Sequence, residues 1–296
     1  MIPNPILTQV KVFAILKVEL CVIKLINHKK LNNTIMKANQ SKTVLFVTGA
    51  FVSHLGWRPW QQYFEQLGYT TYAPSWPNKN GTPQELRNKR PNDIALAKTT
   101  ITDVVNSYAD FIQTLPEKPI IIGHSFGGLV TQILLDRGLA AAAIAVHSVP
   151  PFGVIPFEFS FTKAAWRSLG LFTSLDKTYL MSFETWQYAF TNGMSLADQQ
   201  KAYDENIIPE SKRVARGGLT LAASVSFKKE HAPLLFIAGG KDNIIPASLN
   251  KRNFNSYKNK NAVTDFKQFD ENNHFVVSLP NWKNTAEYIY NWIQQQ

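Results

Sequence analysis

The chain has 296 residues, of which 45% are hydrophobic and 12% aromatic, so it can bury a core and is not a disordered or fibrous polymer. Its 31 basic residues exceed its 21 acidic ones by ten, but residues 1–42 hold seven lysines and one glutamate, which leaves residues 43–296 with a surplus of only four. That larger part has no stretch in which clustered basic residues alternate with aromatics, which argues against a nucleic-acid partner. One cysteine, Cys21, excludes an intramolecular disulfide framework and favours a reducing compartment such as the cytoplasm.

Residues 1–42 are expected to form an extension outside the folded domain. The run Ile6–Ile26 is apolar overall but contains four charged residues, which disfavours a membrane-spanning helix. A signal peptide is disfavoured as well, because no basic region precedes the run and no small-residue cleavage site follows it. The preferred interpretations are a loosely attached, disordered extension or an upstream start ahead of Met36, and the alternative is a helix that associates with a membrane surface.

From residue 43 onward, predicted strands alternate with predicted helices. Short runs rich in β-branched and aromatic residues predict strands over Thr43–Thr48, Tyr69–Tyr72, Pro119–Ile122, Ala141–Val146, Pro233–Ala238 and Val263–Phe269. Helical patterns cover Trp57–Leu67, Ile94–Leu115, Gly127–Arg137, Pro246–Tyr257 and Trp282–Ile293, and a surface loop is predicted from Pro74 to Pro83. Nearly continuous apolar strands that alternate with helices predict an α/β fold, with a mostly parallel sheet covered by helices on both faces.

The alternation is interrupted between residue 150 and about residue 229. No strand pattern appears there, whereas Thr162–Leu169 and Phe183–Phe190 look helical. Eleven aromatic residues fall between residues 150 and 190, more than a solvent-exposed linker would tolerate. We therefore predict one domain over residues 43–296 with a helical cap inserted at about 150–229, whose aromatics pack it onto the sheet domain or line an apolar cleft beneath it.

The segment GHSFG, residues 123–127, follows a predicted strand directly and precedes an apolar helix. In this context G-x-S-x-G is typical of a sharp strand-to-helix turn that presents a serine nucleophile, and its two glycines leave room for neighbouring backbone. Ser125 is therefore the candidate nucleophile. The N-terminus of the following helix lies where it favours developing negative charge.

A serine hydroxyl needs a histidine base and a carboxylate that orients this base, and both have candidates at the same edge of the predicted sheet. Asp242 follows the fifth predicted strand, and His274 follows the last one. The rival acids fit less well, since Asp265 lies within the last strand and Asp270 is too close to His274 to approach it from a separate loop. The chain order Ser, Asp, His also matches that of hydrolases built on such a sheet.

The other histidines are weaker candidates for the base. His28 lies in the extension, His231 precedes a strand, and His124 is adjacent to the nucleophile and points elsewhere. His54 and His147 follow the first and fourth strands at the functional edge, so we take them as candidate pocket residues. Three aromatics are added to this candidate substrate pocket: Phe51, Phe152 and Trp186.

An oxyanion formed from the substrate carbonyl needs two backbone N–H donors. One is the N–H of Phe126, the residue after the nucleophile. The second is expected from the loop after the first strand, where Gly49 relaxes the turn. The N–H of Ala50 is the preferred donor there, and that of Phe51 is the alternative.

Together, the segments GHSFGG, TGAF, GGKDNIIP and NNHF resemble the α/β-hydrolase superfamily over residues 43–296, and look like its capped, single-domain esterases. The resemblance implies a nucleophile at Ser125, an acid at Asp242, a base at His274 and oxyanion donors at Phe126 and Ala50. Many relatives have His-Gly where this chain has Thr48 and Gly49. The hydrogen bonds that brace the oxyanion loop in those relatives are therefore not implied here, although no catalytic group is lost.

These residues predict a serine hydrolase that cleaves carboxylic esters of apolar or aromatic substrates through an acyl-enzyme, as a carboxylesterase or lipase does. The alternatives are a non-catalytic small-molecule binder or receptor on the same fold, and another reaction of the same triad such as perhydrolysis or C–C bond hydrolysis. No cofactor or metal is expected, since the sequence has no H-E-x-x-H, no paired cysteines and no phosphate-binding glycine motif. The expected partner is a small apolar ester.

Overall fold

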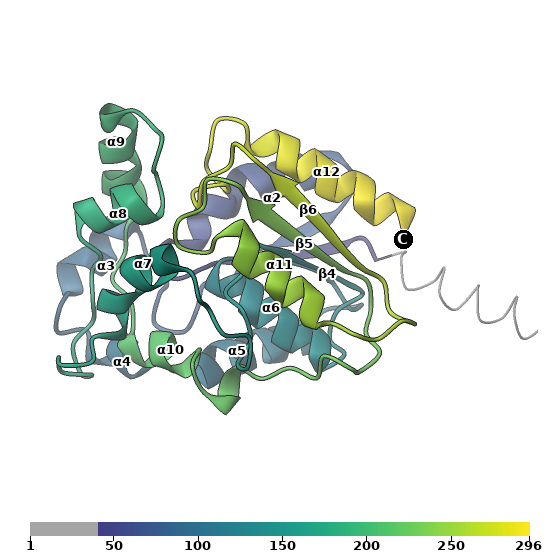
Figure 1. The fold of residues 1–296 in the computed structure, drawn as a ribbon, viewed down its shortest axis with the longest axis horizontal. Coiled ribbons are helices and arrows are strands. Elements are labelled where there is room, and N and C mark those ends of the chain that lie inside the picture. The colour runs from purple at the N-terminus through teal and green to yellow at the C-terminus, as the bar shows by residue number, and fades with distance from the viewer. Residues whose placement is uncertain (1–40) are drawn as a thin grey trace, which may run out of the picture. The chain divides into compact units, whose positions relative to one another are not determined.

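The computed structural model of this protein describes residues 41–296, which are drawn in colour in Figure 1. The predictions made for the N-terminal extension, among them the upstream start and the membrane-associated helix, lie outside the described residues. Residues 41–295 form one compact unit. Within the described part of the chain, no helix is both long enough and apolar enough to cross a bilayer.

A parallel sheet of six strands lies at the centre of residues 41–296. Its strands are β1 (Thr43–Val47), β2 (Thr70–Tyr72), β3 (Ile120–His124), β4 (Ala142–Val146), β5 (Leu234–Gly239) and β6 (Thr264–Phe269). Their order is β2-β1-β3-β4-β5-β6, and every neighbouring pair is parallel. The predicted α/β fold with a mostly parallel sheet is confirmed, and each predicted strand overlaps an observed one.

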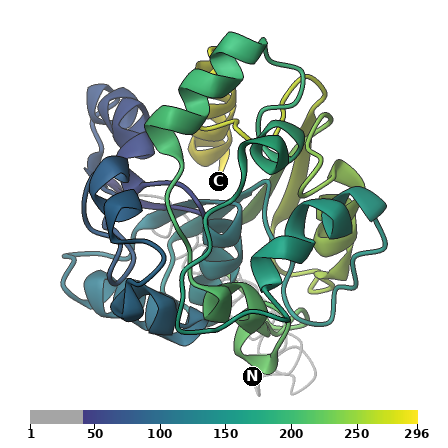
Figure 2. The same cartoon turned by 90° about the vertical axis from the view of Figure 1, so that its left-hand side faces the viewer.

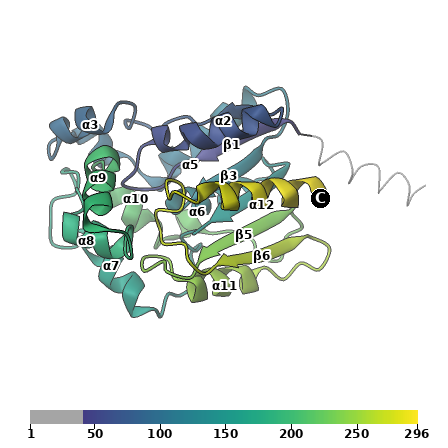
Figure 3. The same cartoon turned by 90° about the horizontal axis from the view of Figure 1, so that it is seen from above.

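Helices cover both faces of the sheet, because successive side chains of a strand point to opposite faces and both sets are apolar. One set packs against α5 (Ile101–Gln113), α6 (Phe126–Asp136) and α11 (Ala247–Ser256). The other set packs against α2 (Arg58–Gln66) and α12 (Trp282–Gln295). In Figure 1 the first group lies below the strands and the second above them, and Figure 3 shows the second group in front of the sheet.

The helix predicted over Ile94–Leu115 is two helices in the structure, α4 (Ile94–Lys98) and α5. The hydroxyl of Thr100 accepts a hydrogen bond from the N–H of Asp103, and the Asp103 carboxylate accepts one from the N–H of Thr100. This reciprocal cap begins a new helix at the following residue. A second capping box begins α3 (Pro83–Lys89), a helix that was not predicted.

Between β4 and β5 lies a helical segment, which we call the cap. It contains α7 (Phe159–Leu169), α8 (Phe183–Ala189), α9 (Leu196–Asn206), α10 (Lys212–Gly217) and the 3-10 helix η2 (Leu221–Ala223). Figure 2 turns the cap toward the viewer. α9 was not predicted, because Gln199 and Ala202 are its only buried residues and leave no clear apolar stripe. An apolar cluster that includes Phe51, Trp186 and Phe275 joins the cap to the loops of the sheet domain.

The direction of the strand order changes at β1. The chain passes from β1 to β2 on one side, then crosses to β3 on the other side, and β4, β5 and β6 follow outward from there. Loops after β1 and β3 therefore diverge at the carboxyl edge of the sheet, which is where open α/β sheets form binding crevices. Residues from both loops line a cavity at this edge.

Candidate active site

Ser125 occupies the turn between β3 and α6. Its backbone has φ 58° and ψ −121°, a conformation that residues with a side chain rarely adopt. The N–H of Ser125 donates to the carbonyl of Val146 at 2.9 Å, and the carbonyl of Ser125 accepts from the N–H groups of Gly128 and Val149 at 3.0 Å. The strained turn is thus held by α6, by β4 and by the loop after β4.

Two glycines allow this turn to lie against its neighbours. A Cβ on Gly123 would lie 2.2 Å from the carbonyl oxygen of Gly127 and 2.2 Å from Oγ1 of Thr131. A Cβ on Gly127 would lie 2.2 Å from the carbonyl oxygen of Val47. Because no side chain tolerates such distances, both positions require glycine.

Three side chains that the sequence placed at one edge of the sheet lie in line. Nε2 of His274 is 2.9 Å from Oγ of Ser125, and Nδ1 of His274 is 2.6 Å from Oδ2 of Asp242. All three residues are buried. They follow β3, β6 and β5, so the parallel register of the sheet brings together residues that are up to 149 positions apart in sequence.

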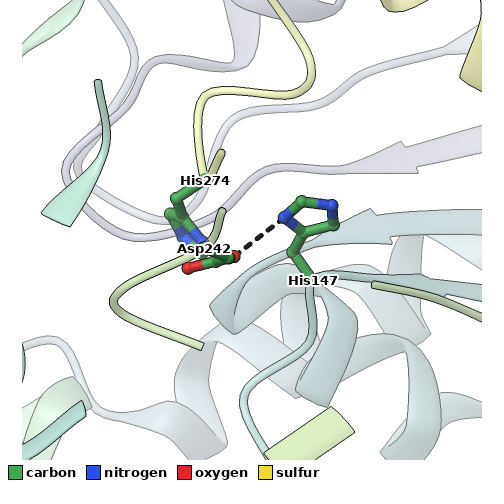
Figure 4. A group of neighbouring side chains, drawn as sticks. All are labelled: His147, Asp242 and His274. Carbon is green, nitrogen blue, oxygen red and sulfur yellow. Dashed lines mark hydrogen bonds and ion pairs between the residues drawn. The ribbon is translucent and has the colours of Figure 1, made fainter. Parts of the chain in front are cut away.

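The carboxylate of Asp242 accepts four hydrogen bonds. Oδ1 accepts from the N–H of Ile244 at 2.9 Å and from that of Ile245 at 2.7 Å. Oδ2 accepts from His274 and, at 2.8 Å, from Nδ1 of His147 (Figure 4). Burial by itself raises the pKa of this carboxyl group, but the nearby His274 and the hydrogen bonds from both histidines outweigh burial and hold the pKa well below its usual range. Asp242 is therefore an ionised acceptor with a fixed orientation.

The side chains around Asp242 also include the residue types that bind metal ions. His147, Asp242 and His274 are the one set in the described part of the chain with ligand atoms close enough to hold an ion, all within 4.8 Å of one another. These atoms already face one another at hydrogen-bond distances of 2.6 and 2.8 Å. We therefore assign the group to hydrogen bonding around the carboxylate.

His147 has a role that the sequence did not predict. It directly follows β4, and its ring fills the space beside Gly239, where a Cβ would lie 2.3 Å from Cε1 of His147. Because an ionised carboxylate only accepts hydrogen bonds, Nδ1 of His147 carries the proton that it shares with Asp242. Burial lowers the pKa of His147 although Asp242 opposes this effect, so the ring is neutral at pH 7.

His124 contacts the loop that carries His274. Its Nε2 donates to the backbone carbonyl of His274 at 2.9 Å, and the two rings lie 4.7 Å apart. Burial, followed by the nearby His274 and His147, holds the pKa of His124 well below its usual value. A second neutral imidazole therefore supports the arrangement of His274.

Residues 48–51, the candidate oxyanion loop (called the oxyanion loop below), lie between β1 and the cavity. The N–H of Phe51, the alternative oxyanion donor, is already bound to Oε2 of Glu210 at 3.3 Å. Among residues 41–296, the N–H groups of Ala50 and Phe126 have no hydrogen-bond partner, and both residues line the cavity. Both donors preferred from the sequence are thus unoccupied, whereas the alternative donor, the N–H of Phe51, is not.

Comparison with known proteins agrees with this architecture. A model of the alpha/beta hydrolase family matches residues 44–282. The chain belongs to the α/β-hydrolase family. No curated protein sequence matches it, so its similarity to individual proteins comes from solved structures.

Several solved structures share the fold of this α/β-hydrolase at low sequence identity. A methylesterase from Arabidopsis has a TM-score of 0.60 and 16% identity, with 86% of this chain and 99% of that chain covered. An extracellular α/β-hydrolase from a Paenibacillus species has a TM-score of 0.62 and 19% identity, with coverages of 84% and 98%. A monoacylglycerol lipase from Paleococcus ferrophilus has a TM-score of 0.59 and 20% identity, with coverages of 85% and 93%. At these identities the likeness shows the fold.

The cavity beside Ser125 in this α/β-hydrolase encloses about 260 Å³. Its wall comes from the loops after β1, β3 and β4, from α7 and α10 of the cap, and from the segment before α11. The lining side chains are apolar except for Ser125, Ser168 and Glu210. Glu210 forms a buried ion pair with Lys79 at 2.6 Å, so no unpaired charge lies on this wall.

The predicted pocket residues divide into two groups. Phe51 and Phe152 line the cavity. The residues that do not line it are His54, His147 and Trp186. Trp186 is fully buried within the cap and stacks on Phe190 with ring centroids 4.4 Å apart, and His54 begins the 3-10 helix η1 (His54–Trp57). An aromatic side chain or a histidine near the site has the same sequence pattern whether it packs in the interior or lines the cavity. The sequence therefore did not distinguish the two groups.

Proposed function

We propose that this α/β-hydrolase is a serine hydrolase that cleaves carboxylic esters of apolar or aromatic substrates through an acyl-enzyme. The observation that carries the proposal is the unbroken line of hydrogen bonds from Ser125 through His274 to Asp242, beside an apolar cavity. A serine hydroxyl becomes nucleophilic at neutral pH when a base within hydrogen-bond distance takes its proton, and this line supplies such a base.

In the first half-reaction, Nε2 of His274 takes the proton of Ser125 while Oγ attacks the ester carbonyl carbon. The carbonyl oxygen becomes an oxyanion, which accepts hydrogen bonds from the N–H groups of Ala50 and Phe126. Asp242 stabilises the imidazolium of His274, which then gives its proton to the departing alcohol oxygen as the C–O bond breaks. The acyl group remains on Ser125.

In the second half-reaction, water replaces the alcohol. His274 takes a proton from water as the water oxygen attacks the acyl carbon, and the same two N–H groups bind the second oxyanion. The imidazolium then returns the proton to Oγ of Ser125 as the carboxylic acid leaves. The enzyme is restored, and no other reactant is needed.

The cavity supports an apolar acyl or aromatic part in the substrate. Its wall is apolar, and the one carboxylate on it, Glu210, is neutralised by Lys79. Apolar surfaces of a substrate gain from leaving water in such a cavity, whereas an unpaired substrate charge would lose its hydration without a partner. Two proteins of similar fold are named as a methylesterase and a monoacylglycerol lipase, which supports ester cleavage here.

A fluorophosphonate probe tests the nucleophile, because it reacts with an activated serine. Wild-type protein should be labelled, and the Ser125→Ala variant should not. Ser168→Ala is the matched control, since Ser168 lines the same cavity but donates its hydroxyl to the carbonyl of Ala165 at 2.5 Å. This control should be labelled like the wild type. Labelling of Ser125→Ala, or no labelling of the wild type, would contradict the assignment.

Turnover of p-nitrophenyl esters with acyl chains of increasing length tests the reaction. We expect hydrolysis that falls by at least about 10⁴-fold in Ser125→Ala. A short-chain optimum would indicate a carboxylesterase, and a long-chain optimum a lipase. Labelling without ester turnover would indicate another triad reaction, such as perhydrolysis or C–C bond hydrolysis, and ligand binding without labelling or turnover would indicate a non-catalytic binder.

A further inference from the structure

A buried ion pair from outside the sheet contacts the oxyanion loop. Nζ of Lys79 lies 2.6 Å from Oε2 of Glu210, and both side chains are 2% exposed. Lys79 belongs to the segment between β2 and α3, and Glu210 to the cap segment between α9 and α10. Neither charge takes part in the acyl transfer described above. Because removing two charges from water costs free energy, the burial of this pair requires an explanation other than acyl transfer.

Each partner of the pair also binds the backbone of the oxyanion loop. Oε2 of Glu210 accepts the N–H of Phe51 at 3.3 Å, and Nζ of Lys79 donates to the carbonyl of Gly49 at 3.4 Å. These two contacts lie on either side of Ala50. Because the peptide groups before and after Ala50 are held, the direction of its unoccupied N–H is held as well.

Further contacts hold the rest of the loop. Nε1 of Trp76 donates to the carbonyl of Thr48 at 3.1 Å, and Nζ of Lys79 lies 3.8 Å from the centre of the Trp76 ring. The N–H of Ile208 donates to the carbonyl of Phe51 at 3.0 Å. Phe51 has a φ of 66°, a strained conformation that persists only where surrounding contacts hold it. Thr48, which stands where many relatives have histidine, is thus held through its backbone.

We propose that Lys79 and Glu210 are positioning residues that direct the N–H of Ala50 toward the oxyanion, and that they make oxyanion stabilisation depend on the position of the cap. This inference rests on the proposed function, because it requires an oxyanion at Ser125. The cap segment 208–210 supplies both partners of Phe51, the Glu210 carboxylate and the Ile208 N–H. A displacement of this segment therefore removes the contacts that hold Phe51. The N–H of Ala50 is then directed toward the oxyanion, beside that of Phe126, only when the cap segment lies in this position.

A series of variants separates positioning from a purely structural role. Lys79→Met and Glu210→Leu each leave a buried charge without its partner, so each should strongly destabilise the fold. The double variant Lys79→Met/Glu210→Leu removes both charges and should regain most of that stability. If the pair only stabilised the fold, activity would return together with stability. We expect kcat of the double variant to stay about 10- to 100-fold below that of the wild type.

A second double variant isolates the hydrogen bond to the loop. Lys79→Met/Glu210→Gln also lacks both charges, but its amide keeps one acceptor oxygen for the two backbone N–H groups, of Phe51 and Ser211, that Glu210 binds. Its kcat should lie between the wild-type value and that of the Leu-containing double variant, about 3- to 10-fold below the wild type. Equal activities of the two double variants would contradict a role for the Phe51 contact.

The readout is the inhibition constant of a trifluoromethyl ketone, measured beside kcat and KM for one ester. Such a ketone adds to Ser125 and forms a tetrahedral oxyanion adduct, so its affinity reports oxyanion stabilisation. Its inhibition constant should rise by the same factor by which kcat falls, while KM changes by less than about threefold. Glu158→Gln is the control. It breaks another ion pair between the cap and the sheet domain, Arg252 with Glu158 at 2.9 Å, and should leave kcat and inhibitor affinity within about twofold of wild type.

Unchanged kcat and inhibitor affinity in a folded double variant would overturn the proposal. If the Leu-containing double variant does not fold, the Gln-containing double variant tests the proposal instead. The Gln-containing variant still lacks the contact from Lys79 to Gly49. Failure of this inference is distinguishable from failure of the proposed function. In the first case the wild type keeps both labelling and ester turnover that depend on Ser125, and in the second case it lacks ester turnover, with or without labelling.

Discussion

The two halves of the candidate site are supported by different parts of the molecule. On the acid side, the neutral imidazoles of His147 and His124 contact Asp242 and the backbone of His274, and all four residues belong to the strands of the sheet or the loops after them. On the oxyanion side, the loop around Ala50 is held by charged and aromatic side chains that come from the cap and from the segment before α3. The hydrogen bonds to Asp242 itself all come from the sheet domain, whereas those to the loop around Ala50 come in part from the cap.

This difference predicts that the two halves respond to different changes. The four hydrogen bonds to Asp242 come from the loops after β4, β5 and β6, although the cap also contacts these loops where Phe190 lies against His274. The oxyanion side requires that the cap segment 208–210 lies against the loop. Changes among the donors to Asp242 should therefore affect proton transfer, whereas displacement of the cap segment 208–210 should affect oxyanion binding.

Asp242→Asn should break the acid side with the largest effect. Four donors face the carboxylate, and an amide nitrogen accepts from none of them, so either the two backbone N–H groups or the two imidazoles lose their acceptor. We expect kcat in steady-state ester hydrolysis to fall about 10⁴-fold with little change in KM. Asp270→Asn is the control, because Asp270 is exposed and binds Gln268, and its kcat should stay within about twofold of wild type. A loss below tenfold for Asp242→Asn would exclude Asp242 as the orienting acid.

Acidification should weaken the acid side through its two neutral imidazoles. In the folded protein the pKa values of His124 and His147 lie below 6.5, chiefly because burial disfavours the charged ring. Below pH 6.5 the unfolded chain therefore binds more protons than the folded chain. The free energy of unfolding should fall with decreasing pH by up to about 1.4 kcal/mol per pH unit for each histidine.

Denaturant unfolding between about pH 7.5 and pH 5.5 measures this slope. The control variant His124→Gln retains an N–H donor for the carbonyl of His274 but no longer titrates. The slope of its unfolding free energy against pH should be smaller than that of the wild type by the contribution of one histidine. Identical slopes in the variant and the wild type would contradict the prediction for His124.

The sheet and the line of three side chains were predictable because each depends on a local pattern. β1, β3, β4 and β5 are buried along their whole length, so their sequences are apolar without alternation. The spacing of two glycines identified Ser125 as a candidate, and positions just after predicted strands identified Asp242 and His274. The break before α5 was also readable, since Thr100 and Asp103 have the spacing of a capping box.

The supports of the site were not predictable, because they join residues that are far apart in sequence. Lys79 and Glu210 are 131 positions apart, and each has the sequence surroundings of an ordinary surface charge. The contact of His147 with Asp242 follows from the pairing of Val146 with Ile237, a register that no local pattern encodes. The type and charge of a side chain indicate what kind of group it can bind. Which group it actually contacts depends on the fold.

The smallest effect is expected from changes at His147, whose N–H donates a hydrogen bond to the carboxylate of Asp242. His147→Phe keeps a ring but removes the N–H that binds Asp242, whereas His147→Asn presents an amide N–H near the same place and tolerates the φ of 46° at this position. We expect kcat to fall about tenfold in His147→Phe and to stay within about threefold of wild type in His147→Asn. KM should change little in both, because His147 does not line the cavity. Full kcat in a folded His147→Phe variant would mean that the N–H groups of Ile244 and Ile245 suffice to hold the acid, and that the acid side needs no support from a second histidine.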